Sequence, residues 1–272
     1  MMTYLRLTHF ELRRFLPTYV GLLLFLLVGQ LLVVFRNQQI ELGGIAAFIK
    51  EGKTVDHFLA EHGPFTMAPV GLSIIYQGAF IIVLTIITLY SLFIWYRDWY
   101  GKNTIIYRLL TLPHARLSLF WAKFTTIALL WLGAITWQIS IIPIQQLFYE
   151  MRFPTEAVTS VPIYSVLKNI NPSLFIHPAN TVEMITLFQG GILFLLTLFT
   201  MIVIERAYHF TGIVPAIIYG VCIYAITTFP SQWFHSYMYP SERFFLDSTI
   251  FLLVMAMNLL IAHRLMKTRI TV

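Results

Sequence analysis

Charged residues are scarce in this sequence, and their scarcity argues against a water-soluble protein. Only 11% of the 272 residues are charged, whereas soluble globular proteins carry about 25%. Hydrophobic residues make up 58% of the chain, so too few polar side chains remain to cover a surface in water. The sequence therefore predicts an integral membrane protein in which no separate soluble domain fits.

Cysteine is almost absent, because Cys222 is the only one and lies in an apolar run. An intrachain disulfide and a cysteine-based metal site are therefore excluded. The net charge of +6 would indicate nucleic acid only if the basic residues formed a solvated patch, but they stand at the ends of apolar runs. We expect membrane lipids, and no nucleic acid, among the partners.

Signatures of catalytic sites are also missing. Gly52-Lys53-Thr54 resembles the end of a phosphate-binding loop, but Ala47 occupies the position of its leading glycine. The best metal candidates are His57, Glu61 and His62. Their spacing matches no known zinc motif, and a polar face on a short helix explains them better. We therefore expect no metal site, no catalytic residue and no ATP hydrolysis in this chain.

Six apolar runs alternate with polar segments along the chain. Each reaches or approaches the ~20 apolar residues that cross a hydrocarbon core about 30 Å thick. The predicted fold class is all-α, a polytopic membrane protein with a single transmembrane domain over residues 1–272. The expected transmembrane helices are 18–35, 72–96, 117–144, 182–204, 210–229 and 244–265.

Residues 3–16 precede the first span and are too short and too charged to cross the membrane. A helix advances by about 100° per residue, which places several apolar residues of this segment on one arc. The segment predicts an amphipathic helix lying at the membrane interface, and Pro17 is expected to break it. The alternative is a solvated tail. The residues on the arc are Tyr4, Leu5, Thr8, Leu12, Phe15 and Leu16.

Lysine and arginine set the expected orientation, since cytoplasmic segments carry the excess of both. With the N-terminus inside, twelve lie inside and six outside. The inner ones are Arg6, Arg13, Arg14, Arg97, Lys102, Arg108, Arg116, Lys123, Arg206, Arg264, Lys267 and Arg269. The outer ones are Arg36, Lys50, Lys53, Arg152, Lys168 and Arg243. Both termini are therefore expected in the cytoplasm, with residues 37–71 and 145–181 outside.

The longest inner loop, residues 97–116, contains a short predicted helix, Thr104–Leu112, which Pro113 stops. Five of its residues are large aliphatics, and a solvated loop has no reason to carry them. An apolar helix of this kind docks into a groove of a protein partner. The alternative is a helix half-sunk in the inner leaflet. The aliphatic residues are Ile105, Ile106, Leu109, Leu110 and Leu112.

This stretch resembles the permeases of ABC-2 type transporters. In that family an acidic residue follows span two, and after it come a Gly/Thr turn, a run like Leu-Leu-x-x-Pro-x-x-Arg, and a Lys in the next helix. The matching positions here are Asp98, Gly101 with Thr104, Leu109-Leu110-Thr111-Leu112-Pro113-His114-Ala115-Arg116, and Lys123. Asp98 stands where Glu is common, and Gly101 is separated from Thr104. These departures leave open whether Asp98 forms a salt bridge.

The resemblance implies an exporter in the cell membrane. Two permease subunits, identical or paralogous, would enclose a pathway, and a separate ABC ATPase that binds ATP and Mg²⁺ would dock under each. The permease itself would bind no cofactor, and the helix Thr104–Leu112 would couple it to the ATPase. The implied coupling residues are Asp98, Thr104, Arg108, Leu109, Leu110, Pro113, Arg116 and Lys123.

Neutral polar residues occupy the centres of the expected spans. The pathway candidates are Gln30, Gln77, Gln138 and Gln189. Uncharged groups suit lipid-like, peptide or drug-like amphiphiles, although such glutamines also bond between helices at about 0.6–2 kcal/mol each. Two other functions stay open: a membrane anchor or sensor subunit of an ATPase complex that forms no pathway, and an intramembrane enzyme, which the lack of paired acids or histidines disfavours.

The orientation can be tested by cysteine accessibility. We predict that a membrane-impermeant thiol reagent will leave a cysteine at position 103 unlabelled in intact cells and will label cysteines placed in residues 37–71. Labelling at position 103 in intact cells would overturn the topology.

Overall fold

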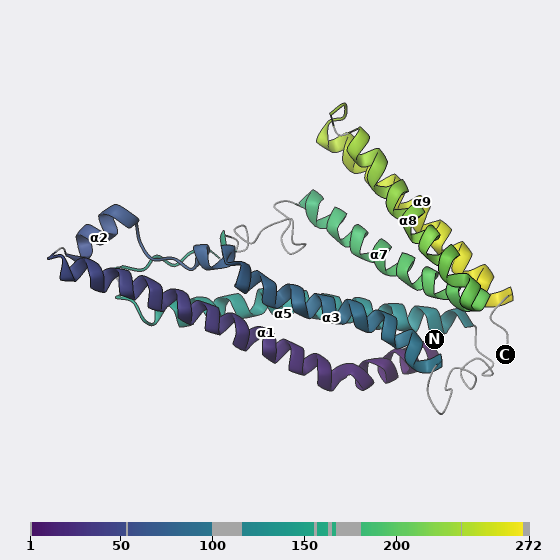
Figure 1. Cartoon of the computed structure of the whole chain (residues 1–272), viewed down its shortest axis with the longest axis horizontal. Coiled ribbons are helices and arrows are strands. Elements are labelled where there is room, and N and C mark those ends of the chain that lie inside the picture. The colour runs from purple at the N-terminus through teal and green to yellow at the C-terminus, as the bar shows by residue number, and fades with distance from the viewer. Residues whose placement is uncertain are drawn as a thin grey trace. The chain divides into compact units, whose positions relative to one another are not determined.

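The structure, a computed structural model, describes residues 2–52, 54–99, 116–154, 157–162, 165–166, 181–234 and 236–268. These residues form seven α-helices, six of which are long and apolar enough to cross a membrane (Figure 1). The predicted fold class is thereby confirmed, and the chain is a polytopic helical membrane protein. The helices are α1 (Met2–Lys50), α2 (Val55–His62), α3 (Ile74–Trp99), α5 (Arg116–Glu150), α7 (Thr181–Tyr208), α8 (Ile213–Trp233) and α9 (Pro240–Thr268).

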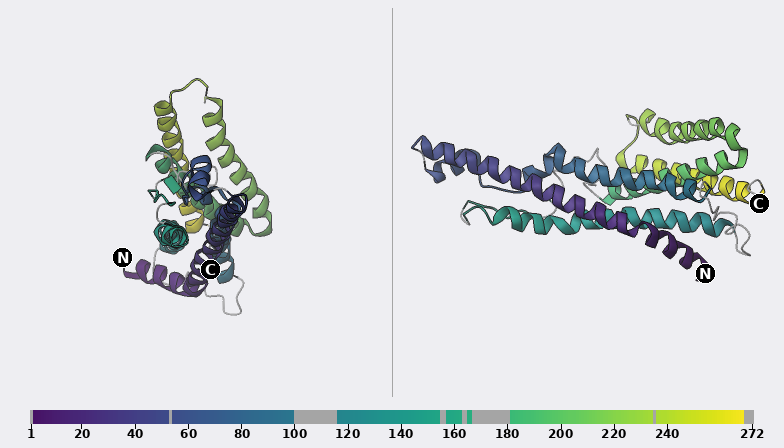
Figure 2. Two further views of the ribbon diagram at one scale, coloured as in Figure 1. Left: turned by 90° about the vertical axis from the view of Figure 1, so that its left-hand side faces the viewer. Right: turned by 60° about the horizontal axis from the view of Figure 1, so that its bottom comes forward.

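The first helix, α1, is continuous over 49 residues (Figures 1 and 2). The prediction that Pro17 breaks the N-terminal helix is wrong, because Pro17 lies inside α1. Proline removes one backbone hydrogen bond and crowds the carbonyl four residues earlier, but this bends a helix more readily than it ends one. Contacts on either side hold the helix together: Phe15 stacks on Tyr90, and the Tyr19 hydroxyl donates to the Leu130 carbonyl.

The length of α1 takes it well beyond a lipid bilayer. At 1.5 Å per residue it is about 74 Å long, more than twice the ~30 Å of hydrocarbon that a span crosses. Its apolar run ends at Phe35, and Arg36 and Asn37 follow. The last turns of α1, up to Lys50, therefore lie outside the hydrocarbon.

Contacts divide the chain into two compact units. Unit 1 comprises residues 1–15, 87–129 and 180–272, and unit 2 comprises residues 16–86 and 130–179. The helices α1, α3 and α5 each contribute one part to unit 1 and the other part to unit 2.

In unit 2, segments from the two long polar stretches of the sequence fold against each other. The Phe65 amide donates to the Ala157 carbonyl at 2.9 Å, and the Thr159 amide donates to the Phe65 carbonyl at 3.1 Å. The Phe65 ring stacks on Phe58 of α2 and on Phe153. These rings belong to a buried apolar cluster that also includes residues of α1, α3 and α5, so described parts of residues 37–71 and 145–181 share one small core.

In unit 1, α8 and α9 both pack on α7. Leu193, Ile223 and Val254 form the buried contact between the three helices. Asn258 of α9 adds polar bonds, accepting from the Tyr219 hydroxyl at 3.0 Å and donating to the Thr197 hydroxyl at 3.4 Å. In an apolar environment such bonds fix the register of neighbouring helices.

The turn between α7 and α8, the 3₁₀ helix His209–Gly212, is closed by a tight backbone contact. A Cβ atom at Gly212 would lie 2.6 Å from the Glu205 carbonyl oxygen and 2.8 Å from the Glu205 Cα. Backbone atoms cannot turn aside as a side chain can, so only glycine fits without a shift of α7. Gly190, also in α7, is different, because a Cβ there meets no atom within 4 Å.

We predict that Gly212→Ala will destabilise the folded protein by about 1–3 kcal/mol, the usual range for an overpacked site. Gly190→Ala is the matched control and should be neutral or stabilising by up to ~1 kcal/mol, since alanine favours a helix interior more than glycine does. Thermal unfolding in detergent, followed by size-exclusion chromatography, measures both. Equal midpoints for the two variants would contradict the tight contact at Gly212.

Candidate functional site

One carboxylate, that of Glu11 in α1, joins the helices that flank residues 100–115. Its Oε2 accepts from the Arg97 guanidinium at 2.9 Å, and its Oε1 accepts from Lys123 Nζ at 3.1 Å. Arg97 lies in the last turn of α3, and Lys123 lies two turns into α5. The cluster of Glu11, Arg97 and Lys123, called the Glu11 cluster below, therefore ties α1 to both helices that enter this loop. All three residues belong to unit 1.

Lys123 is the buried cation of the Glu11 cluster, with a side-chain exposure of 0% against 4% for Glu11. Besides the carboxylate, its ammonium donates to the Ile94 carbonyl at 2.6 Å and lies 5.4 Å from the centroid of the Trp95 ring. An isolated ammonium in an apolar interior is strongly disfavoured. The Glu11 carboxylate, the Ile94 carbonyl and the Trp95 ring together replace the contacts that the ammonium would make with water.

Arg97 stands at the edge of the Glu11 cluster, where 28% of its side chain is exposed. Its guanidinium carbon lies 5.7 Å from the centroid of the Tyr90 ring. Tyr90 in turn stacks on Phe15 of α1 with ring centroids 3.7 Å apart. Glu11 and Phe15 thus both contact α3. These contacts hold one face of the N-terminal segment against the protein.

Part of the predicted arc of the N-terminal segment is buried against the protein, and part of it is exposed. Thr8, Glu11 and Phe15 are buried, whereas Leu5 and Leu16, which the arc grouped with Thr8 and Phe15, are 57% and 51% exposed. Glu11 was missed because it stands among basic residues and reads as part of a solvated face. A signal was present, since Glu11 is the only acidic residue before Glu41.

Most of the predicted coupling residues lie outside the described residues. This applies to Thr104, Arg108, Leu109, Leu110 and Pro113. Asp98 and Arg116 lie in the terminal turns of α3 and α5, but their side chains are not described. Lys123 is the one coupling residue whose side chain the structure describes. It contacts the carboxylate of Glu11, which lies in α1.

A closed network of neutral side chains occupies unit 2 and contains two of the four pathway candidates. Gln30 of α1 donates to Gln138 Oε1 at 3.0 Å and accepts from Gln145 Nε2 at 2.9 Å. The Tyr76 hydroxyl of α3 donates to Gln145 Oε1 at 2.6 Å. The four side chains are 0–1% exposed. They bond α1, α3 and α5 together, which is the interhelical role given above as the alternative to a pathway.

The remaining two pathway candidates are also bonded within the protein. Gln77 is buried and donates to the Gly71 carbonyl at 2.7 Å. Gln189 lies in unit 1, where its amide and the Ser248 hydroxyl are 3.3 Å apart. The structure brings Gln30 and Gln138 together and places Gln77 and Gln189 elsewhere.

The candidate metal residues serve other contacts. His57 Nδ1 lies 3.3 Å from Glu61 Oε1 on one exposed face of α2, and the His62 ring stacks on Phe58. Within the described part of the chain, no group of three histidine, cysteine or acidic residues could hold a metal ion.

No protein-family model matches this chain, and no curated protein or solved structure is significantly similar to it. The resemblance to ABC-2 permeases therefore rests on residues 97–123 and on the layout of the spans.

We predict that the Glu11 cluster behaves as a buried ion pair. Glu11→Leu removes the carboxylate that lies 3.1 Å from the buried Lys123 ammonium and should destabilise the protein by roughly 3–5 kcal/mol. Arg97→Gln should be much milder, because Arg97 is partly exposed and Glu11 keeps Lys123. The double variant Glu11→Leu/Lys123→Met removes both buried charges and should recover most of the loss. A double-mutant cycle on detergent-unfolding midpoints checks this, and strictly additive effects would refute the pairing.

Proposed function

We propose that this chain is the permease subunit of an ATP-driven exporter of the ABC-2 type, coupled to a separate ATPase through residues 97–116. The observation that carries the proposal is the Glu11 cluster. The two helices on either side of the loop, α3 and α5, both bind one carboxylate of α1 through Arg97 and Lys123. A loop that only linked two spans would not need a buried anion to hold both of its ends.

The Glu11 cluster supplies a route for mechanical coupling. When the partner ATPase binds ATP and Mg²⁺, it displaces the loop helix Thr104–Leu112. Because Arg97 and Lys123 flank the loop and both bind Glu11, the displacement acts on α3, α5 and α1 together. Rigid helices with discrete packing arrangements carry such a displacement along their length. The loop thus shifts three helices as one group.

The resemblance also implies the assembly around the chain. A second permease subunit, identical or paralogous, completes the pathway in the cell membrane, and both termini lie in the cytoplasm with the ATPase. The chain itself binds no cofactor. The neutral polar residues expected at the centres of the spans suit an amphiphilic substrate more than a small ion.

A second candidate is a membrane anchor or sensor subunit that binds an ATPase without forming a pathway. The closed network of Gln30, Tyr76, Gln138 and Gln145 favours it, because the bonding groups of these side chains face one another rather than a substrate. Reconstitution with the ATPase in liposomes separates the two functions. Substrate-stimulated ATPase activity with movement of the substrate supports the exporter, and ATP hydrolysis that no substrate stimulates supports the anchor.

The coupling loop is tested by charge insertion. We predict that Leu109→Asp will abolish co-purification of the ATPase, because an unpaired carboxylate in an apolar groove costs several kcal/mol. The permease should still insert into the membrane, since position 109 lies outside every span. Arg116→Ala should be mild, at ~1 kcal/mol, if Arg116 only contacts headgroups. It should be as severe as Leu109→Asp if Arg116 bonds the backbone of the loop.

Ile49→Asp is the matched control. It places the same charge on an exposed aliphatic position, 53% accessible, near the far end of α1, on the side where no ATPase is expected. Wild-type recovery of the ATPase with Ile49→Asp and none with Leu109→Asp is the expected pattern. Wild-type recovery with Leu109→Asp would mean that another part of the chain binds the partner.

A further inference from the structure

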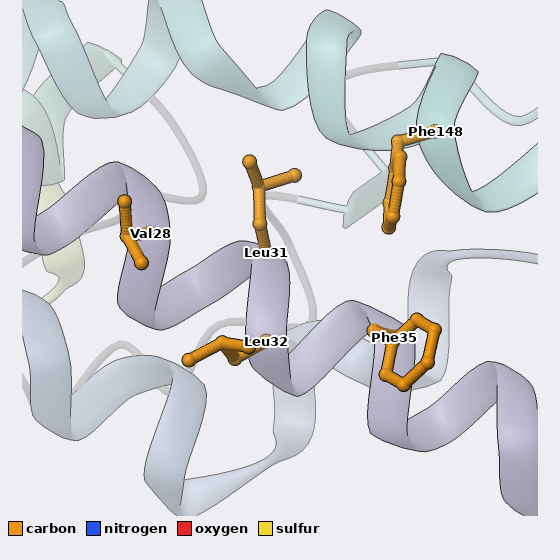
Figure 3. A pocket seen from close by; sticks show the side chains of 5 residues that line it. All are labelled: Val28, Leu31, Leu32, Phe35 and Phe148. Atoms are coloured by element: carbon orange, nitrogen blue, oxygen red, sulfur yellow. The ribbon is translucent and has the colours of Figure 1, made fainter.

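A groove of about 290 Å³ runs between α1 and α5 within unit 2. Four side chains from two turns of α1 line one side, and the Phe148 ring reaches towards them from α5 (Figure 3). All five lining side chains are hydrocarbon: Val28, Leu31, Leu32, Phe35 and Phe148. Such a surface offers no hydrogen bond to a polar ligand, so only an apolar group fits it.

The groove ends where the apolar part of both helices ends. Its residues Val28–Phe35 occupy the last turns of the apolar run 18–35, and Arg36 follows directly. On α5, Glu150 comes two residues after Phe148. Leu32, at 63% exposure, faces outwards. The groove therefore lies in the hydrocarbon layer immediately below the headgroups, on the side of the membrane that carries residues 37–71.

A cation stands at the end of the groove. The guanidinium carbon of Arg152 lies 4.6 Å from the centroid of the Phe35 ring, and the side chain is exposed. No carboxylate in the described part of the chain pairs with Arg152. A guanidinium held over an aromatic ring keeps its N–H donors free at its edge. These donors match the oxygens of a phosphate, which they bind in pairs.

We propose that this groove binds an anionic phospholipid of that leaflet, with one acyl chain along Val28, Leu32 and Phe148 and the phosphate on Arg152. The hydrocarbon lining, the depth below the headgroups and the exposed cation each match one part of such a lipid. A second copy of the chain fits less well. A symmetric contact brings the same patch of both copies together, and here it would set Arg36 and Arg152 of one copy against those of the other. The lipid site stands independently of the transport function.

Photolabelling in vesicles tests the site. The full-length protein is reconstituted in phosphatidylcholine vesicles containing a small fraction of phosphatidylglycerol with a diazirine in one acyl chain. After illumination, we expect the label on peptides that carry Val28–Phe35 or Phe148. Leu32→Trp fills the groove and should reduce this labelling severalfold. Leu24→Trp is the matched control, because Leu24 is also exposed, at 53%, but does not line the groove, and its labelling should equal that of the wild type.

The headgroup contact is tested separately. Arg152→Gln should lower labelling by the phosphatidylglycerol probe about fivefold, which corresponds to the ~1 kcal/mol of one cation near an anionic surface. Labelling by a phosphatidylcholine probe should stay unchanged. Arg243→Gln removes an arginine expected on the same side of the membrane, one whose guanidinium contacts Ser231, and should change neither signal.

Three outcomes would overturn the proposal. Equal labelling of Leu32→Trp and Leu24→Trp would show that no lipid chain occupies the groove. Equal effects of Arg152→Gln and Arg243→Gln would remove the headgroup contact. Efficient disulfide-linked dimers of Leu32→Cys, formed in a Cys222→Ser background, would show that a second copy covers the groove instead.

Discussion

The packing of α1 against α5 is the constraint on which the other features depend. The bonds between the two helices pair residues whose numbers rise together, so the helices run in the same direction although α3 separates them in the chain. In lipid, apolar side chains gain little by leaving the bilayer for another helix, and polar bonds therefore specify the partner. The pairs are Glu11 with Lys123, Tyr19 with the Leu130 carbonyl, Gln30 with Gln138, and Gln38 with the Tyr149 carbonyl.

Four polar residues of α1 follow a regular spacing that keeps them on one face of this very long helix. Thr8, Tyr19, Gln30 and Glu41 are eleven residues apart. Eleven residues make close to three turns, about 3.67 residues per turn, so a face with this repeat drifts little around a helix. Three of the four contact α5: Tyr19 and Gln30 by the bonds above, and Glu41 by accepting from the Tyr149 hydroxyl. A face with a strict seven-residue repeat, at 3.5 residues per turn, would drift further around a straight helix over the 49 residues of α1.

The sequence predicted the six spans because an apolar run of this length has one structural solution in lipid. It did not predict the helix bounds, which depend on tertiary contacts. Pro17 and the glycine pair Gly43-Gly44 both favour a helix end, yet α1 passes through them. The Phe58 ring of α2 lies 3.8 Å from the position that a Cβ atom would take at Gly44 of α1. This contact joins two different helices. Local propensity loses to such contacts whenever enough surface is buried.

The same limit applies to the candidate site. Lys123 could be found because the resemblance of residues 97–123 places a lysine there. Its partner Glu11 is 112 residues away. The sequence marks Glu11 as a lone acidic residue, but it does not show that Glu11 pairs with Lys123. The glutamines were found by type, as neutral polar residues within apolar runs, but type alone does not separate a pathway from an interhelical bond. The bonds that Gln30 makes with Gln138 and Gln145 join α1 to α5, and they cannot be read from residue type.

Pro17 separates the contacts of the Glu11 cluster from those that α1 makes further along its length. The boundary between the two units falls between Phe15 and Leu16 in α1, immediately before Pro17. There the helix lacks a backbone hydrogen bond and bends at low cost. No proline interrupts α3, and in α5 Pro143 lies beyond the boundary at Leu129. Of these three helices, only α1 has a proline close to the boundary between the units. Because α1 bends at low cost at Pro17, the bonds of Glu11 and those of Gln30 each fix their own part of this helix.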